Sequence, residues 1–341
     1  GDINIKLNIR GPTNSLIRDG EISIDDGSIY TILMDEPVKN ISASATLSDN
    51  IMEISLFNST VDDSDLKKKI DNHLNLSGEI DFKHFFEPRY DLKILGNNIF
   101  YRSLNGDIEG YGDLDLTIIG KDTLEIVGAI KAKNGAIYKE FNSEQALPSI
   151  EEKGRITTNY NVRFPIEDTF SIRNSQIDAK VAGELAMSRQ FESDWNYSGE
   201  INFIEGKIYY YLGDVFEDLN GSMTLDGEGF NPFLELTAST QIGDAKIMLG
   251  VFGAFDNPEW TFDSDKGYTE SDILQLLTFN TRVAEEGFTT EGLGTQAQTI
   301  LGAYLERELE RNFFKSTGLK STGLIEDVEI SGTSELINPG Q

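Results

Sequence analysis

Two histidines, His73 and His84, are the first residues to consider for chemistry, because histidine titrates near neutral pH. The chain contains no cysteine, which excludes disulfides and thiol nucleophiles. No compact group of acidic residues accompanies either histidine. His73 lies in a polar stretch, and His84 precedes Phe85 and Phe86, so packing or surface exposure explains them better than catalysis.

The acidic residues suggest two other kinds of site. Asp62, Asp63 and Asp65 resemble part of a calcium-binding loop, but the glycine and the distal glutamate that such a loop requires are missing. The number of acids, 58, would allow a glycosidase pair. Most of them, however, occupy alternating positions in which a carboxylate is simply solvated.

The glycine-containing stretch GSMTLDGEGF at residues 221–230 resembles a phosphate-binding loop only in composition. A phosphate cradle needs a strand, then glycines, then the N-terminus of a helix, whereas this stretch lies between two predicted strands. We therefore expect no enzymatic activity, no cofactor and no bound metal.

The net charge and the pattern of apolar residues argue against further classes of protein. The formal net charge of the 341 residues is −29, which argues against binding nucleic acid or lying broadly on an anionic bilayer. No apolar run approaches the ~18 residues that a membrane span needs, and no signal peptide is visible. The chain opens in the middle of an alternating run, so we expect a fragment of a longer protein.

From residue 1 to about 262 the apolar residues recur with period two, as in antiparallel strands with one apolar and one polar face. The predicted fold is mainly β, as roughly twenty short strands in an elongated, curved antiparallel sheet. The apolar positions expected to line its inner side are Ile3, Ile5, Leu7, Ile9, Ile22, Ile24, Ala43, Ala45, Leu47, Ile80, Phe82, Leu114, Leu116, Ile118, Ile130, Ile177, Ala179, Val181, Ile201, Phe203, Met223, Leu225, Leu234, Leu236, Ala238, Ile247 and Leu249.

One short template occurs three times, as GEISIDDGSIY at 20–30, GAIKAKNGAIY at 128–138 and GEINFIEGKIY at 199–209; residues 78–82 (GEIDF) repeat its first half. The unequal separations exclude a solenoid with a fixed step. The second glycine stands where a tight loop needs positive φ, so we interpret the template as a hairpin. The first glycine indicates a bulge or a close approach of two backbones.

After residue 262 the spacing of the apolar residues changes from period two to the spacing of helices. Residues 269–280 begin with cap-type and acidic residues and then place apolar side chains at helical spacing, as do residues 295–315. The apolar positions of these two amphipathic helices are Ile273, Leu276, Leu277, Ile300, Leu301, Tyr304, Leu305, Leu309 and Phe313. We expect three parts: a continuous β-groove at 1–262, a helical segment at 263–318, and a final strand and tail at 319–341.

A sheet with one apolar face must cover that face or offer it to a guest. Two sheets packed together would give sandwiches, whereas one sheet that curves lengthwise would give an open trough. Twenty strands at ~4.8 Å would make this trough nearly 100 Å long. Such a trough suits an aliphatic guest, because each CH₂ removed from water contributes ~0.8 kcal/mol.

Residues 160–280 resemble the C-terminal domain of TamB, in the AsmA-like group of bridge-type lipid-transfer proteins. The resemblance is carried, in order, by NVRFP, IDAKVAGELAM, SGEINFIEGKIYY, LNGSMTLDGEGFNPFLELTAS, KIMLGVFGAFDNPEWTFDSD and YTESDILQLLTFN. The segment ending near GLKSTGL and the following IEDVEIS fit as well. The chain differs from the family pattern at Asn280, where glycine is frequent, and lacks the strands expected after Ile330.

This resemblance implies a taco-shaped β-groove in the periplasm of a diderm bacterium. The parent protein would be anchored in the inner membrane and would meet an outer-membrane barrel of the TamA or BamA type. The group is associated with phospholipid movement to the outer membrane and with assembly of outer-membrane proteins such as autotransporters.

Three functions are compatible with this sequence. The first is a non-enzymatic conduit for phospholipid acyl chains, with the amphipathic helices plugging or lining the groove or touching a membrane. The second is an assembly factor whose strand edges template outer-membrane β-proteins. The third is an extracellular adhesive β-protein, which would bury its apolar face completely.

Overall fold

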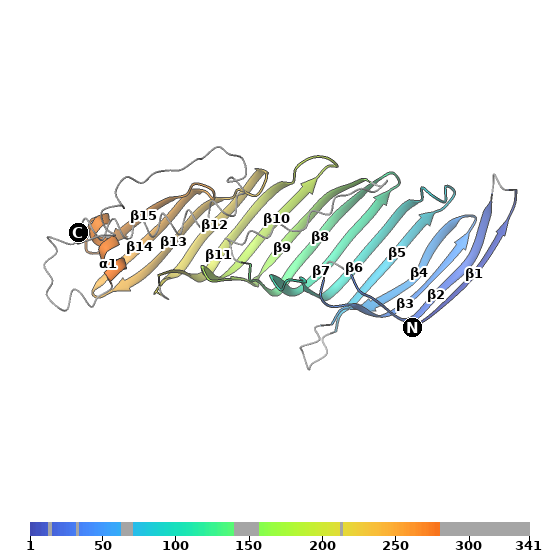
Figure 1. Cartoon of the computed structure of the whole chain (residues 1–341), viewed down its shortest axis with the longest axis horizontal. Coiled ribbons are helices and arrows are strands. Elements are labelled where there is room, and N and C mark those ends of the chain that lie inside the picture. The colour runs from blue at the N-terminus through green and yellow to red at the C-terminus, as the bar shows by residue number, and fades with distance from the viewer. Residues whose placement is uncertain (13–15, 32–33, 63–70, 140–156, 212–213, 280–341) are drawn as a thin grey trace, which may run out of the picture. The chain divides into compact units, whose positions relative to one another are not determined.

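The computed structural model describes residues 1–12, 16–31, 34–62, 71–139, 157–211 and 214–279. The chain divides into two compact units, one formed by residues 1–140 and 148–273, the other by residues 141–147 and 274–341. The first unit contains a sheet of fifteen strands, and the strands lie side by side in the order in which they occur in the chain (Figure 1).

Within the described ranges the strands are longer and fewer than the roughly twenty short strands expected. Their bounds are β1 Asp2–Arg10, β2 Ile17–Ile29, β3 Val38–Ser48, β4 Ile51–Thr60, β5 His73–Asp81, β6 Arg89–Arg102, β7 Ile108–Gly120, β8 Thr123–Ile137, β9 Thr157–Arg173, β10 Ile177–Arg189, β11 Asn196–Tyr211, β12 Asp214–Glu228, β13 Phe233–Ile242, β14 Ala245–Ala254 and β15 Glu259–Ser264. At ~4.8 Å a step, fourteen spacings span about 67 Å, rather than the predicted 100 Å.

Neighbouring strands are antiparallel with one exception in the described sheet. Strand β9 runs parallel to β8, with Thr123 opposite Thr157 and Ile137 opposite Ile172. The expectation of a wholly antiparallel sheet is therefore wrong at this place. A parallel pair needs a crossover of a dozen or more residues, and the stretch between Ile137 and Thr157 is long enough to provide it.

The repeated template is not a hairpin. Its copies lie almost wholly inside single strands, β2, β8 and β11, so the predicted turns at Gly27, Gly135 and Gly206 are wrong. In their place the register of each strand shifts against a neighbour, as between Ile24 and Gly27. A β-bulge also uses glycine and positive φ, and Asp26 has a φ of 54°. Local sequence therefore could not distinguish a bulge from a turn.

The leading glycine of the template marks a close approach of two backbones, as predicted. A Cβ added to Gly20, Gly78 or Gly199 would lie 2.1 Å from a backbone carbonyl oxygen of the neighbouring strand, and at Gly128 the distance would be 2.0 Å. Atoms cannot approach so closely, so these positions require glycine.

Apolar and polar residues alternate along the regular parts of the strands, and this alternation determines which side chains are buried. In β13 and β14 the apolar side chains of one face are buried, as at Leu236 and Leu249, while Glu235 and Lys246 are exposed. Every residue of β1 is exposed, including its isoleucines. The buried core is therefore concentrated in the later strands of the sheet.

Helix α1 spans Glu270–Phe279, within the helix predicted at 269–280. The backbone N–H of Asp272 donates to Thr269 Oγ1 at 3.3 Å, and the Thr269 N–H donates back to Asp272 Oδ2 at 3.1 Å. This reciprocal capping satisfies two N–H groups at the start of the helix. The second predicted helix, with Ile300, Leu301, Tyr304, Leu305, Leu309 and Phe313, lies outside the described residues, as does the final strand.

Candidate functional site

The candidate site is the apolar face of the sheet, which we define by rows of directly opposed residues. Directly opposed residues of neighbouring strands point to the same face. One row runs without a break from β1 to β9 through Ile5, Ile22, Ala45, Ile54, Gly78, Leu92, Ile118, Ile126 and Tyr160.

A second row continues the apolar face from β6 to β14. Its members are Ile99, Gly112, Ala132, Ile166, Gly183, Ile201, Met223, Leu234 and Gly253. The two rows overlap on β6 to β9. Uncharged positions therefore follow one another across the sheet from β1 to β14, perpendicular to the strands.

The structure brings the predicted lining residues of the sheet together on this face. In each strand they occupy alternate positions, and their cross-strand partners are uncharged except at Ile9, which lies opposite Arg18. Phe82 lies just beyond the end of β5, where its N–H donates to the carbonyl of Asn50 at 2.8 Å. That these residues contact a guest stays a prediction.

Sequence reasoning missed several members of the face. Leu92 of β6 is a member of the first row, and Tyr90 and Ile94 of β6 and Met187 of β10 lie on the same face. Their period-two spacing would have revealed them. In β6 they alternate with the charged residues Asp91 and Lys93, so the signal is present in the sequence.

Solvent exposure differs along the face. Ile5 on β1 is 64 % exposed, whereas Ile247 on β14 is 0 % exposed. The apolar residues of β2 to β8 are mostly half-buried. Contiguous exposed apolar surface of this kind marks an interaction site in proteins.

The opposite face of the sheet is polar and rich in cross-strand ion pairs. Lys133 Nζ lies 2.5 Å from Asp113 Oδ2, and Lys180 Nζ lies 2.8 Å from Glu205 Oε1. The Asp113 carboxyl has a lowered pKa: its partial burial raises the pKa, but hydrogen bonds from Lys133 and the Asn98 N–H and the charges of Lys133 and Lys131 lower it more. These interactions are structural.

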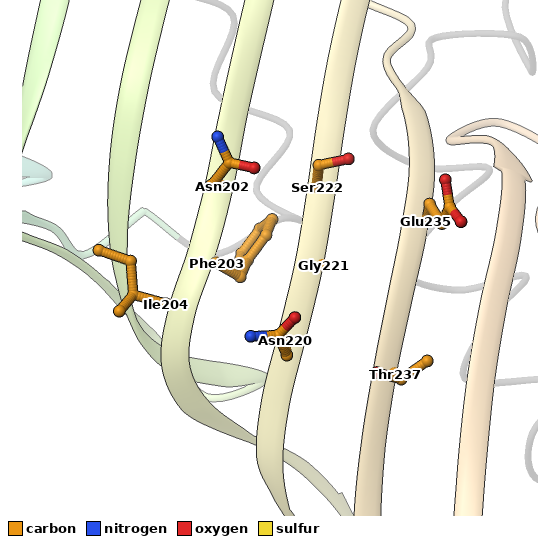
Figure 2. Close-up of a pocket in the computed structure, with 8 residues that line it drawn as sticks. All are labelled: Asn202, Phe203, Ile204, Asn220, Gly221, Ser222, Glu235 and Thr237. Atoms are coloured by element: carbon orange, nitrogen blue, oxygen red, sulfur yellow. The ribbon is translucent and has the colours of Figure 1, made fainter.

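A shallow depression of about 520 Å³ lies on β11 to β13 (Figure 2). Most of its lining belongs to the polar face, but Phe203 and Gly221 lie directly opposite each other on the apolar face. The lining residues are Asn202, Phe203, Ile204, Asn220, Gly221, Ser222, Glu235 and Thr237. Its single titratable side chain, Glu235, has no partner with which to form an acid–base pair within the lining.

Metal sites and membrane-spanning helices are the other features considered for the described ranges. No three His, Cys, Asp or Glu side chains gather there in a way that could hold a metal ion. In the same ranges, no helix has the length and apolar character needed to cross a membrane.

Comparison with known proteins gives a family. No curated protein matches the chain significantly. The family model described as the TamB C-terminal domain matches residues 60–338, which is most of the chain. The chain therefore belongs to the TamB C-terminal domain family, a family of periplasmic, envelope-associated proteins of outer-membrane assembly and lipid transport.

Proposed function

We propose that the chain is a non-enzymatic lipid conduit, in which phospholipid acyl chains move along the apolar face between the inner and outer membranes. The observation that carries the proposal is the continuity of the two rows, which together reach from β1 to β14. By family, the proposal includes an inner-membrane anchor on the parent protein and an outer-membrane partner of the TamA or BamA type.

The continuity of the rows matters because transport of a lipid through water is limited by exposure of its acyl chains. Each exposed CH₂ costs ~0.8 kcal/mol, so two long chains cost more than about 20 kcal/mol. An apolar wall without polar interruptions lowers this cost at every step. No energy-yielding site on the sheet is needed for movement down a gradient.

The conduit is best tested by a substitution at a half-buried position of the apolar face, where a new carboxylate does not disrupt folding. Aspartate at Ile201, Phe203 or Leu236 would also interrupt the apolar face. These residues are only 3 %, 5 % and 8 % exposed, however, and a buried unpaired carboxylate would disrupt folding. Ile118 belongs to the first row and is half-buried. Its neighbour Thr117 is also half-buried and points to the polar face, where Lys93 Nζ donates to its hydroxyl.

We therefore expect Ile118→Asp to reduce lipid recovery several-fold, because its carboxylate interrupts the row, while the matched control Thr117→Asp leaves recovery unchanged. Recovery is measured by mass spectrometry of organic extracts of the purified chains, with circular dichroism to verify folding. Equal lipid recovery from both folded variants would contradict the conduit.

The rival function, strand templating for outer-membrane proteins, has one favourable observation. Within the described sheet β1 pairs only with β2, and all nine of its residues are exposed. A photo-crosslinker at Asn4, on the polar side of β1, would then capture a β-barrel polypeptide. The conduit instead predicts lipid adducts from a crosslinker at Ile5.

A further inference from the structure

Among the side chains that the structure describes, two charged residues lie directly opposite members of the apolar face, and both are arginines. Arg18 of β2 lies directly opposite Ile9, and Arg189 of β10 lies directly opposite Tyr160, the last member of the first row. The chain has 58 acidic residues and 29 basic ones, yet no acid whose side chain the structure describes lies directly opposite a member of this face. The sign of the charge on this face is therefore opposite to that of the chain.

The guanidinium of Arg189 is held by neutral groups at the edge of the face. Its Nε donates to the carbonyl oxygen of Ser193 at 3.1 Å, in the turn between β10 and β11. Its central carbon lies 5.6 Å from the centroid of the Trp195 ring, which in turn lies 5.4 Å from the ring of Tyr160. This cation–π contact and the hydrogen bond together hold the guanidinium beside the Trp195 ring.

Arg18 has the same kind of environment on a distant strand. Its Nη1 donates to Asn50 Oδ1 at 3.0 Å and to the carbonyl oxygen of Phe82 at 3.4 Å. Its central carbon lies 4.9 Å from the centroid of the Phe85 ring. Each arginine thus combines a stacked aromatic ring with a backbone carbonyl from a nearby turn.

Neither arginine forms an ion pair within the part of the chain that the structure describes. Other arginines in those ranges do: Arg10 Nε lies 3.0 Å from Asp19, and Arg163 Nη1 lies 3.7 Å from Glu184 on the polar face. Glu192 and Asp194 are the acids of the turn beside Arg189, and both are exposed. The printed hydrogen bonds of both guanidinium groups therefore end on neutral oxygens, and no described acid neutralises their positive charges. This arrangement favours binding of an external anion.

We infer that Arg18 and Arg189 each bind the phosphate of a phospholipid headgroup at the edge of the apolar face. The inference rests on the proposed function and adds headgroup recognition to it. The planar guanidinium suits a phosphodiester, because its N–H groups match the phosphate oxygens. The neighbouring Tyr160 and Trp195 suit the boundary between acyl chain and headgroup, because each combines an apolar ring with a polar group.

The two positions bind separate molecules. Strands β2 and β10 are eight steps apart in the sheet, which corresponds to about 38 Å. This distance exceeds the size of one headgroup, so the arginines mark two stations along the path of the lipid.

The experiment compares two lipids with the same acyl chains, dioleoyl phosphatidylglycerol and dioleoylglycerol, which lacks the phosphate. Extraction of each from vesicles is measured for the full 341-residue chain and for the double variant Arg18→Gln/Arg189→Gln. We expect the unmodified chain to prefer the phosphate-bearing lipid by on the order of tenfold, as hydrogen bonds to a charged group require. The double variant should lose this preference and still extract dioleoylglycerol.

Two control variants test whether the preference depends on the position of the arginines and on their positive charge. Arg163→Gln removes an arginine from the polar face of neighbouring β9 and should leave the preference intact. The double variant Arg18→Lys/Arg189→Lys keeps both charges and should retain only part of the preference, because the planar set of N–H groups is lost. Circular dichroism verifies that each variant is folded.

Three results would overturn the inference. The first is equal extraction of the two lipids by the unmodified chain, and the second is a preference that persists in the double variant. The third is binding of glycerol 1-phosphate, which has no acyl chain, as tightly as the lipid, since this would indicate a site for soluble phosphates. Extraction of neither lipid would instead contradict the conduit itself, and the headgroup sites with it.

Discussion

Gly199 of β11 lies directly opposite Leu185 of β10, and a Cβ on this glycine would sit 2.1 Å from the carbonyl oxygen of Glu184. On its other side Gly199 lies opposite Leu225 of β12. The glycine thus stands between two leucines on the apolar face. Because glycine has no side chain, the two backbones can approach closely, and no polar group is added to the apolar face.

The first prediction concerns this approach. Gly199→Ala should reduce the free energy of unfolding by more than about 3 kcal/mol, because its φ of 130° is strained for alanine and its Cβ meets backbone. Gly229→Ala is the control: it has a φ of 74° but no atom within 4 Å of the added Cβ, and should cost about 1–2 kcal/mol. Urea denaturation measures both values. Equal losses would show that the clash is relieved without cost.

The second prediction follows from the difference in burial along the apolar face. Ile247→Ala on β14 should cost about 2–5 kcal/mol, because the side chain is 0 % exposed and its removal leaves a cavity. The same substitution at Ile5, which is 64 % exposed, should cost less than about 1 kcal/mol. Denaturation followed by circular dichroism compares the two. A large loss at Ile5 would mean that β1 is covered in solution.

The third prediction is a pH dependence at Asp113. Its pKa is lowered from 3.8, so its stabilising contribution is fully present above pH 3.8 and is lost as the pH falls through the lower folded-state value. Asp113→Asn should therefore destabilise the protein at pH 7 and weaken its loss of stability below pH 4. Urea midpoints between pH 7 and pH 3 measure the effect. Parallel pH curves for the two proteins would exclude Asp113 as a contributor.

Several features of the fold were predictable because they depend on neighbouring residues alone. The alternation of Ile3, Ile5 and Leu7 with polar residues predicts a strand with two unlike faces, because successive side chains of a strand point to opposite sides. The glycine that leads each template was predicted to mark a bulge or a close backbone approach, and the structure shows the close approach.

Other features needed the structure because they depend on which segments pair. Asp26-Gly27 has the chemistry of a turn and of a bulge, and only the pairing of β2 with β3 on both sides of it shows that the strand continues. The parallel alignment of β8 and β9 likewise has no local signal. The sequence by itself determined that the chain forms strands with one apolar face, since side-chain direction is a property of the backbone. The tertiary structure decided which residues share a row, and so placed Arg18 and Arg189 on the apolar face, because register is set by hydrogen bonds between segments distant in the chain.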